Sequence, residues 1–404
     1  MGRSPGSVIG LDISKGKSDG QVFLDKGQPF GHPFCFQHNQ DGLKQLLDVI
    51  TNVQIKAEKA PIVILESTGH YHQAVIQYLE EHGILFLVVN PLISHQAKKS
   101  SLRKVKTDAV DAFRLCELYY KEEFEDHKKR GVQLLNLRHL TRQYDSLTQM
   151  YVQVKLQFQA VLDQVFPDYR GIFGDLYSRV SLQLLKQFTT PTAFQVAGEA
   201  NIANTITCLC PSRSDRWADE KAGLILAAAA NNPFQKVGYS SHLISLVLYI
   251  DLLLQYQEHL SHLRSQVDAL AEEVEAYQII QSIPGIGSKI AATILSEIGE
   301  IHRFNHAKKL VAFAGIDPSV YASGKFTATS NRITKRGSKK LRHALYLAVL
   351  CGLRKSGSKR LREFYDKKRE SGKPYRVALI ACVNKLLHWI YALLVKQESF
   401  VDLA

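Results

Sequence analysis

Two acidic residues in the first third of the chain stand where a carboxylate can do chemistry. Asp12 lies within the apolar run Val8–Ile13, and Glu66 ends a second apolar run that starts at Pro61. A carboxylate at the end of a buried strand is costly unless a cation or another polar partner offsets its charge. Functional groups of parallel sheets gather at the carboxyl ends of the strands. The two acids therefore predict a shared metal site at one edge of a sheet.

A second pair of acids, Asp108 and Asp111, is spaced so that both side chains share one face of a helix. Four carboxylates from two strands and a helix provide the oxygen ligands that Mg²⁺ prefers. Two such ions about 3.5–4 Å apart can bind the attacking and leaving oxygens of a phosphodiester. The structural alternative is that Asp108 caps the helix and Asp111 is a solvated acid in its first turn.

The positive charge of the chain is concentrated in one segment. The 404 residues carry a formal net charge of +13, and residues 301–376 alone hold 20 Lys and Arg against 4 Asp and Glu. A basic excess confined to one segment predicts a polyanionic partner. Because no stretch resembles a membrane-lying anchor or reaches the ~20 apolar residues that span a bilayer, nucleic acid is favoured over a membrane.

Composition narrows the class of protein further. Hydrophobic residues make up 45% and charged residues 22% of the chain, which is the balance of a globular protein with more than one core. The six cysteines are irregularly spaced, and the amino terminus lacks the apolar segment of a signal peptide. These features predict a cytoplasmic protein without a disulfide framework.

The elements expected around the acids form an α/β domain. Strands are expected at 8–13, 61–66 and 84–90, with 21–24 as a hairpin partner of the first, and helices at 41–53, 71–82 and 108–120. This alternation of strands and helices predicts a mostly parallel sheet.

The middle of the chain has a different pattern. Two long segments, 134–166 and 240–278, contain no Gly or Pro and are rich in Leu, Val and Gln. They predict two long helices, paired either as an antiparallel hairpin or as an intermolecular coiled coil. Residues 189–214 between them are expected to form short elements near the tip of the hairpin. Cys208 and Cys210 are expected to be ordinary thiols, because a zinc site needs further ligands nearby.

The last third begins with a turn motif, Ile283–Lys289. Gly285 and Gly287 permit a tight turn before a helix over 290–298, which is a helix-hairpin-helix pattern. Such a turn can present backbone N–H groups, and here Lys289, to a phosphate. The alternative is a plain Gly-Pro turn between packed helices.

A cation-rich stretch with a serine follows this motif. A serine such as Ser323 can attack a phosphodiester, because nearby cations stabilise the charge on the phosphoryl oxygens. A plain Ser-Gly turn is the alternative. The basic residues expected to bind phosphates are Lys325, Arg332, Lys335, Arg336, Lys339, Lys340 and Arg342.

With these motifs the chain resembles the transposases of the IS110/IS1111 group of insertion sequences over nearly its whole length. The likeness rests on Glu66-Ser-Thr-Gly69, Asn90-Pro91, Lys106-Thr-Asp-Ala-Val-Asp111, Pro284-Gly-Ile-Gly287, Phe313-Ala-Gly-Ile-Asp-Pro318, Ser323-Gly324 and Thr334-Lys-Arg-Gly337. The resemblance implies an α/β RuvC-like (RNase H-like) nuclease domain over 1–130, a helical coiled-coil and oligomerisation region over 131–278, and a mainly helical transposase domain over 279–404 with the helix-hairpin-helix motif and the serine loop.

The resemblance also implies an RNA-guided DNA recombinase. The family's DEDD acids fall on Asp12, Glu66, Asp108 and Asp111, which would hold two Mg²⁺ ions, with Mn²⁺ as a substitute. The family's nucleophile falls on Ser323 and forms a covalent phosphoserine link with DNA. A structured bridge RNA from the element pairs with donor and target DNA, and homodimers assemble into tetramers through the coiled coil. The nearby hydroxyls of Thr327, Thr329 and Ser330 are rival nucleophiles.

Two other functions remain compatible with the sequence. A Holliday-junction-resolvase-like endonuclease would use only the four acids, so it would still cut DNA after Ser323→Ala. A non-catalytic nucleic-acid scaffold would show no Mg²⁺-dependent activity, and Asp12→Ala would then affect stability alone.

Overall fold

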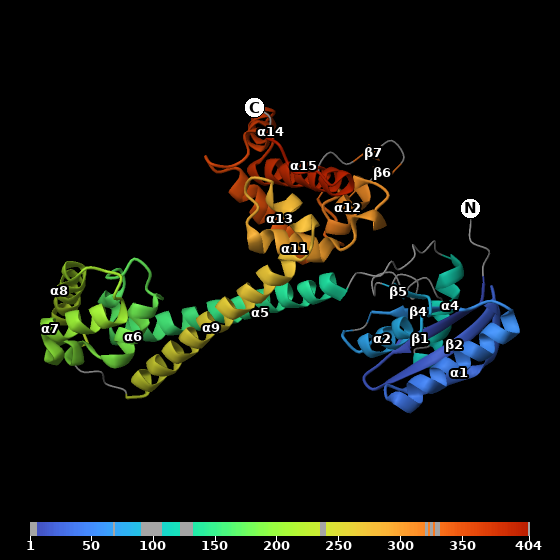
Figure 1. Cartoon of the computed structure of the whole chain (residues 1–404), viewed down its shortest axis with the longest axis horizontal. Helices are drawn as coiled ribbons and strands as arrows, with labels where there is room; N and C mark the ends of the chain where they lie inside the picture. The colour runs from blue at the N-terminus through green and yellow to red at the C-terminus, as the bar shows by residue number, and fades with distance from the viewer. Residues whose placement is uncertain are drawn as a thin grey trace. The chain divides into compact units, whose positions relative to one another are not determined.

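Apolar residues fill β1 (Val8–Ile13), which is the central strand of a five-stranded sheet in the first of two units of the chain, residues 1–129 and 130–404 (Figure 1). The strand order is β3-β2-β1-β4-β5. The other strands are β2 (Lys17–Asp25), β3 (Gln28–Gln37), β4 (Ile62–Glu66) and β5 (Phe86–Val89). The computed structural model describes residues 6–67, 69–89, 107–121, 132–234, 240–319, 322–323, 326–327 and 332–402.

The sheet is mixed, which corrects the expectation of a mostly parallel one. β1, β4 and β5 are parallel, whereas β1, β2 and β3 form an antiparallel meander. The sequence did not predict β3, because Pro29 and Pro33 interrupt its pattern. Proline is tolerated on edge strands, where its missing N–H costs no ladder bond. β3 is such an edge strand.

Helices cover both faces of this sheet. α1 (Gln40–Ala57) and α2 (Gln73–Glu81) pack Leu46 and Val75 against Ile9 and Leu11. On the other face, α4 (Asp108–Lys121) packs Leu115 and Cys116 against Val8 and Ile64. The two cores follow from the alternation along β1, whose successive side chains point to opposite faces.

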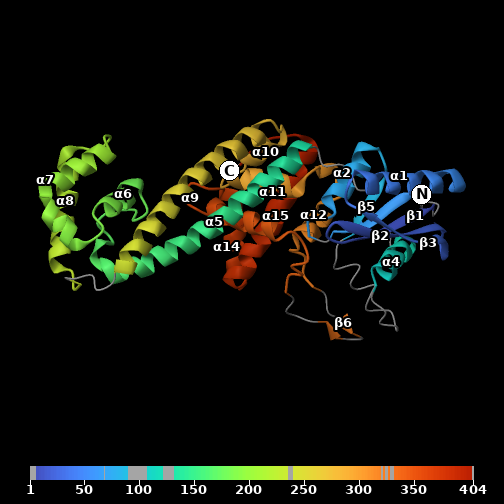
Figure 2. The same ribbon diagram turned by 90° about the horizontal axis from the view of Figure 1, so that it is seen from below.

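Two long helices, α5 (Val132–Val165) and α9 (Ser240–Glu272), lie side by side in the second unit (Figures 1 and 2). Phe158, near the end of α5, shares a core with Leu246 near the start of α9. Leu137, near the start of α5, shares another core with Val267 near the end of α9. The helices are therefore antiparallel. Their role as a coiled coil between protomers stays a prediction.

The chain between α5 and α9 forms a helical subdomain. It consists of η1 (Pro167–Tyr169), α6 (Arg179–Gln187), α7 (Pro191–Leu209) and α8 (Asp215–Asn231). The expectation of short elements over 189–214 agrees with α7 in part, because its 19 residues are divided into two shorter helical segments at Gly198. Thr190 caps this helix by accepting the N–H of Ala193 at 3.0 Å, and Gly198 (φ 73°) introduces a kink. Cys208 and Cys210 are free thiols.

The carboxyl-terminal part of the second unit is a bundle of helices around one core. It contains α10 (Ala276–Gln281), α11 (Ser288–Ile298), η2 (Ile301–Arg303), α12 (Ala307–Ala314), α13 (Lys339–Gly352), α14 (Lys359–Glu370) and α15 (Tyr375–Lys396). Among the described residues, α15 is the one helix long and apolar enough to cross a membrane, with a mean hydropathy of 1.8. Its Leu379, Val383 and Leu387 lie instead in the core of the bundle.

Candidate functional site

The two strand acids lie next to each other at the carboxyl ends of neighbouring parallel strands. β1 pairs with β4 in a register that ends with Leu11 opposite Leu65. Asp12 and Glu66 follow directly, on strands that are about 4.8 Å apart in any sheet. Both side chains are half-buried. The strands thus bring two of the predicted acids together, as expected if both bind the same metal ion.

The helix acids lie on the same face of the sheet. Gly10, two residues before Asp12, faces α4 so closely that a Cβ would lie 2.3 Å from the carbonyl oxygen of Ala112. The N–H of Gly10 donates to Cys116 Sγ at 3.1 Å. Only glycine permits this approach, which sets the start of α4 on the face that carries Asp12. A larger residue at position 10 would displace the helix and its acids.

Asp108 and Asp111 are not needed to cap α4. Thr107 Oγ1 accepts the N–H of Val110 at 3.3 Å, so Thr107 is the cap, and Asp108 is the first helical residue. Asp108 is exposed, whereas Asp111 is 6% exposed. The structural alternative for Asp108 is therefore wrong, and a buried carboxylate at Asp111 requires a cationic partner.

Sequence reasoning missed one acid on this face, Asp19. It lies directly opposite Asp12 in the antiparallel register of β1 and β2, so the two side chains share one side of the sheet. Glu66, Asp12 and Asp19 thus form a row across three adjacent strands. Like charges opposite each other destabilise a sheet unless a cation offsets them. The alternation along β2 was the signal that could have found Asp19.

Protein cations already lie among these acids. Lys17 Nζ is 3.2 Å from Asp19 Oδ2 and 3.8 Å from Asp108 Oδ2. Arg114 Nη1 is 3.4 Å from Asp111 Oδ1. Within the described residues no group of three or more His, Cys, Asp or Glu side chains converges closely enough to hold a metal ion. The all-oxygen donor set is of the kind that Mg²⁺ prefers, and metal binding here stays a prediction.

The predicted nucleophile lies on a hairpin of the second unit. Ser323 ends β6 (Ala322–Ser323), and β7 (Phe326–Thr327) pairs with it antiparallel. The Ser323 side chain lies outside the described residues, as do Lys325, Thr329 and Ser330. The backbone register places Ser323 opposite Phe326, at the turn end of the hairpin.

The base of this hairpin is firmly connected. Pro318 forms a bridge with Ile333, and Ser319 N–H donates to the carbonyl of Arg332 at 2.8 Å. Thr334 Oγ1 donates to Asp317 Oδ1 at 2.7 Å. These bonds hold together the two chain segments that lead to β6 and β7.

The glycine that follows the hairpin, Gly337, allows a close backbone contact. A Cβ on Gly337 would lie 2.0 Å from the carbonyl oxygen of Phe313. Arg342 Nη1 donates to the carbonyl of Ala314 at 2.9 Å, across the same contact. Arg342 thus anchors the end of α12 to α13, and its guanidinium already has a protein partner.

Two predicted phosphate ligands meet at one acid of α5. Lys340 Nζ is 3.0 Å from Asp145 Oδ2, and Lys289 Nζ is 3.5 Å from Asp145 Oδ1. Lys289 also lies 4.2 Å from the ring centroid of Tyr144. The structure therefore brings the turn motif and the start of α13 together. The side chains of Arg332, Lys335, Arg336 and Lys339 are exposed.

The two glycines of the turn motif differ in their surroundings. A Cβ on Gly285 (φ 95°) would lie 2.3 Å from the backbone nitrogen of Gly352, so this glycine permits close packing against the end of α13. Gly287 is exposed and precedes α11, and a Cβ added to it would meet no atom within 4 Å. Contact with a phosphate stays a prediction for both glycines, and Gly287 has the open space for it.

A buried acid, Glu297, connects three helices and was missed by sequence reasoning. Its side chain is 0% exposed and accepts from Arg142 Nε at 2.7 Å, Arg138 Nη2 at 3.4 Å and Ser338 Oγ at 2.9 Å. Burial alone would raise the pKa of the Glu297 carboxyl, but the two arginines and the serine lower it to about 2. The cluster ties α5 and α11 to the first residue before α13. A single acid within the apolar stretch 290–298 could have predicted that this carboxylate is buried and paired.

Glu297→Gln is expected to lower the free energy of unfolding by about 3 kcal/mol. Breaking a buried ion pair costs about 3–5 kcal/mol, and the lower end applies because Arg142 is 47% exposed and can reach water. Because the folded pKa is lowered, the stabilisation is present above the unfolded value of 4.5 and is lost as pH falls towards 2. Urea unfolding at pH 7 and pH 3.5 measures both effects. If Glu297→Gln lowered the free energy of unfolding equally at both pH values, the argument from the charge of Glu297 would be contradicted.

Lys339→Ala is expected to lower the slope of log affinity against log salt by about 1, because each phosphate contact releases counterions. Lys340→Ala is the matched control, since its ammonium is held by Asp145 at 3.0 Å and is less available to a phosphate. Filter binding of duplex DNA at several salt concentrations measures the slopes. An unchanged slope for Lys339→Ala would show that this side chain faces only solvent.

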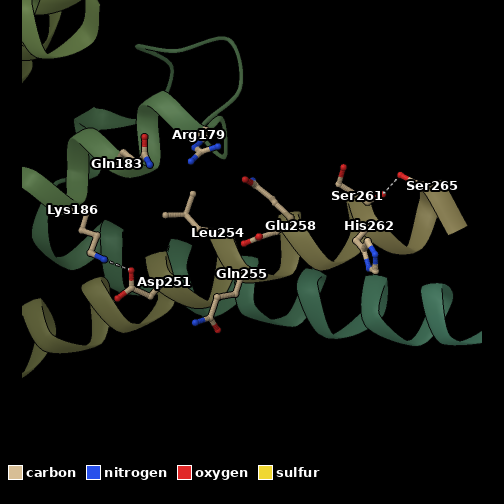
Figure 3. A pocket seen from close by; sticks show the side chains of 11 residues that line it. Arg179, Gln183, Lys186, Asp251, Leu254, Gln255, Glu258, Ser261, His262 and Ser265 are labelled. Atoms are coloured by element: carbon tan, nitrogen blue, oxygen red, sulfur yellow. Dashed lines mark hydrogen bonds and ion pairs between the residues drawn. The ribbon is translucent and has the colours of Figure 1, made fainter. Parts of the chain in front are cut away.

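A groove of the second unit lies elsewhere, along α6 and α9 (Figure 3). It has a volume of about 850 Å³ and contains Arg179, Lys186, Asp251, Glu258 and His262. Lys186 Nζ and Asp251 Oδ1 are 2.5 Å apart. Because basic side chains of α6 face acidic side chains of α9 along it, this groove has no marked preference for a polyanion.

The chain matches two family models of transposases. Residues 9–167 match the model DEDD_Tnp_IS110, described as a transposase, and residues 277–366 match the model described as "Transposase IS116/IS110/IS902 family". The first match contains the acid-bearing sheet and α5, and the second contains the turn motif and the serine hairpin. Together they cover more than half of the chain.

Individual relatives carry the same names. An insertion element IS110 protein of Streptomyces coelicolor is 23% identical over 59% of this chain and 57% of its own length. An insertion element IS116 protein of Streptomyces clavuligerus is 22% identical over 94% of this chain and 95% of its own length. The transposase for insertion sequence element IS1111A of Coxiella burnetii is 30% identical over 45% of this chain and 48% of its own length.

An acid-bearing α/β domain followed by a basic helical region is typical of enzymes that act on nucleic acid. The chain belongs to the IS110 family of insertion-sequence transposases, which cut and rejoin DNA. The resemblance predicted from the sequence motifs is thereby confirmed.

Proposed function

We propose that the chain is an RNA-guided DNA recombinase of an insertion sequence, with a composite site and a covalent phosphoserine intermediate. Asp12, Glu66, Asp108 and Asp111 would hold the metal, and Ser323 would be the nucleophile. Two Mg²⁺ ions, or Mn²⁺ in their place, would supply Lewis-acid stabilisation of the phosphoryl charge. A structured bridge RNA would select donor and target DNA in the cytoplasm by base pairing.

The observation that carries this proposal is the placement of the acids. Asp12 and Glu66 follow paired residues of neighbouring parallel strands, and the helix acids lie on the same face of the sheet. Thr107 caps the helix, so Asp108 has no capping role to explain its presence. Carboxylates gathered from three elements are typical of a metal-dependent phosphodiester site.

The serine accounts for rejoining as well as cutting. Its oxygen would displace the 3′ oxygen of one strand and stay joined to the 5′ phosphate. A 3′-hydroxyl can then displace the serine and reseal a strand without ATP, since the ester keeps the energy of the phosphodiester. The acids alone would activate water and leave cut ends.

Folding or oligomerisation would have to join the acids to the serine, because they belong to different units of the chain. Exposed apolar residues on α9 support contact between protomers: Ile244 is 70% and Leu248 55% exposed, one helical turn apart. Met150 and Leu156 of α5 are also exposed. We propose homodimers that assemble into tetramers, so that cutting is restricted to the synaptic complex. A monomeric variant that cuts DNA at the full rate would contradict this restriction.

A trapping assay tests the proposed function. Purified protein, Mg²⁺, labelled donor and target DNA, and RNA from the flank of the element are mixed, and the products are separated on a denaturing gel. The proposal predicts a protein–DNA adduct that requires both RNA and Mg²⁺. Free cut ends without an adduct would favour the alternative, a Holliday-junction-resolvase-like endonuclease that uses only the four acids.

A further inference from the structure

A groove of about 470 Å³ lies between α14 and α15, apart from the predicted catalytic and phosphate-binding residues. Sites for small ligands have volumes of about 300–1,000 Å³, so it can hold one nucleotide. The side chains that matter in it are Phe364, Lys368, Asn384, Lys385, His388 and Trp389. None of the described residues that line it is acidic, in contrast to the larger groove of Figure 3.

The groove is built from facing stripes of two helices. Phe364 and Lys368 are one turn apart on α14, and Lys385 and Trp389 are one turn apart on α15. Residues four apart lie on the same face of a helix. Both aromatic rings are half-buried, since their inner edges pack against the core of the bundle. Their orientation is therefore fixed before any ligand binds.

Cations lie over both rings. Lys385 Nζ is 5.4 Å from the Phe364 centroid and 5.9 Å from the Trp389 centroid. Lys368 Nζ is 5.2 Å from the Phe364 centroid, and Arg360 lies 5.8 Å from that of Trp389. These distances approach the limit of about 6 Å for cation–π contacts, so the rings hold the cations weakly. The cations can turn to a phosphate at little cost.

Phe400 also packs on Trp389, with the ring centroids 5.1 Å apart. The indole is thus held from the side of Phe400, while its other neighbours are the weakly held cations Lys385 and Arg360. The surface charge of α14 also attracts anions, since this helix carries six Lys and Arg against three Asp and Glu. Asn384 offers an amide donor and acceptor at the same place, and His388 a ring nitrogen.

We propose that this groove binds an unpaired nucleotide of a single-stranded segment. Aromatic faces stack on bases, at about 1–3 kcal/mol per base, while lysines contact the adjoining phosphates. Base pairs of a duplex cannot enter, because their faces are already stacked. The proposal deepens the proposed function and rests on it for the source of the strand, which is either the RNA or an opened DNA strand.

Trp389 itself reports on the groove, because the chain has only two tryptophans. In the full-length Trp217→Phe protein, emission comes from Trp389 alone. Its fluorescence is titrated with ten-nucleotide oligo(U), oligo(dT) and a duplex of the same length. We expect saturable quenching by the single strands and none by the duplex. Tighter binding of oligo(U) would assign the groove to RNA, and equal binding would assign it to either strand.

Paired variants in the same background locate the phosphate contacts. Lys368→Ala with Lys385→Ala should weaken quenching at least tenfold and lower its salt slope by about 1.4, at about 0.7 per contact with a single strand. Lys367→Ala is the matched control, because this exposed residue of α14 does not line the groove. Circular dichroism checks that each variant is folded.

Absent quenching, equal quenching by duplex, or quenching unchanged in the double variant would overturn the proposal. The trapping assay separates this failure from failure of the proposed function. An adduct without quenching would reject only the groove, whereas quenching without an adduct would reject only the recombinase.

Discussion

Ser323→Ala is expected to abolish the protein–DNA adduct and to lower strand cleavage by at least about a thousandfold. Removing a nucleophile leaves only binding and electrostatic stabilisation, and such losses are among the largest that single substitutions cause. Cleavage is measured with labelled DNA in the presence of RNA and Mg²⁺. Nucleic-acid binding should stay within about twofold of the wild type, because alanine removes no charge.

Controls for this variant come from the same hairpin. Thr327→Ala removes a rival hydroxyl on the paired strand β7, and Ser319→Ala removes a hydroxyl that donates to Arg332 at the base of the hairpin. Both should retain the adduct. An adduct that persists in Ser323→Ala and disappears in Thr327→Ala would move the nucleophile to β7.

Asp12→Asn is expected to lower Mg²⁺-dependent cleavage by at least about a hundredfold. Changing a residue that only supports a metal ligand already lowers metal affinity or activity 10–100-fold, and Asp12 is proposed as a ligand itself. Asparagine keeps the size of the side chain and removes its charge. Circular dichroism checks that the variant stays folded, so that a loss of cleavage reports on the missing charge.

Asp48→Asn is the matched control for this change. Asp48 is an exposed residue of α1, which packs on the opposite face of the sheet from α4. It should cleave DNA at the wild-type rate. If Asp12→Asn cleaved as well as Asp48→Asn while both stayed folded, the acids would have no part in catalysis.

Much of the first unit could be predicted from the pattern of apolar runs. β1, β4 and α4 have the predicted positions, so Asp12, Glu66 and Asp111 were recognisable as acids at element ends. Register could not be read in the same way. The position of Asp19 opposite Asp12 depends on the pairing of β1 with β2, which a single sequence specifies only through the turn between them.

In the second unit, charge patterns were less informative than apolar ones. The long helices followed from spacing, whereas the basic residues looked equivalent in sequence. In the structure Arg342 holds a backbone carbonyl, and Lys289 and Lys340 share Asp145. These partners come from segments far apart in the chain, so only tertiary contacts separate structural cations from exposed ones such as Lys339.

Peptide mapping of the trapped adduct tests the central claim most directly. Trypsin cuts after Lys309, Lys325 and Arg332, so Ser323 falls on the peptide 310–325 and the rivals Thr327, Thr329 and Ser330 fall on 326–332. After nuclease digestion, mass spectrometry finds which peptide keeps a nucleotide. We predict a nucleotide phosphate on 310–325, assigned to Ser323 by fragmentation. A nucleotide on 326–332, or on neither peptide, would contradict recombination through Ser323.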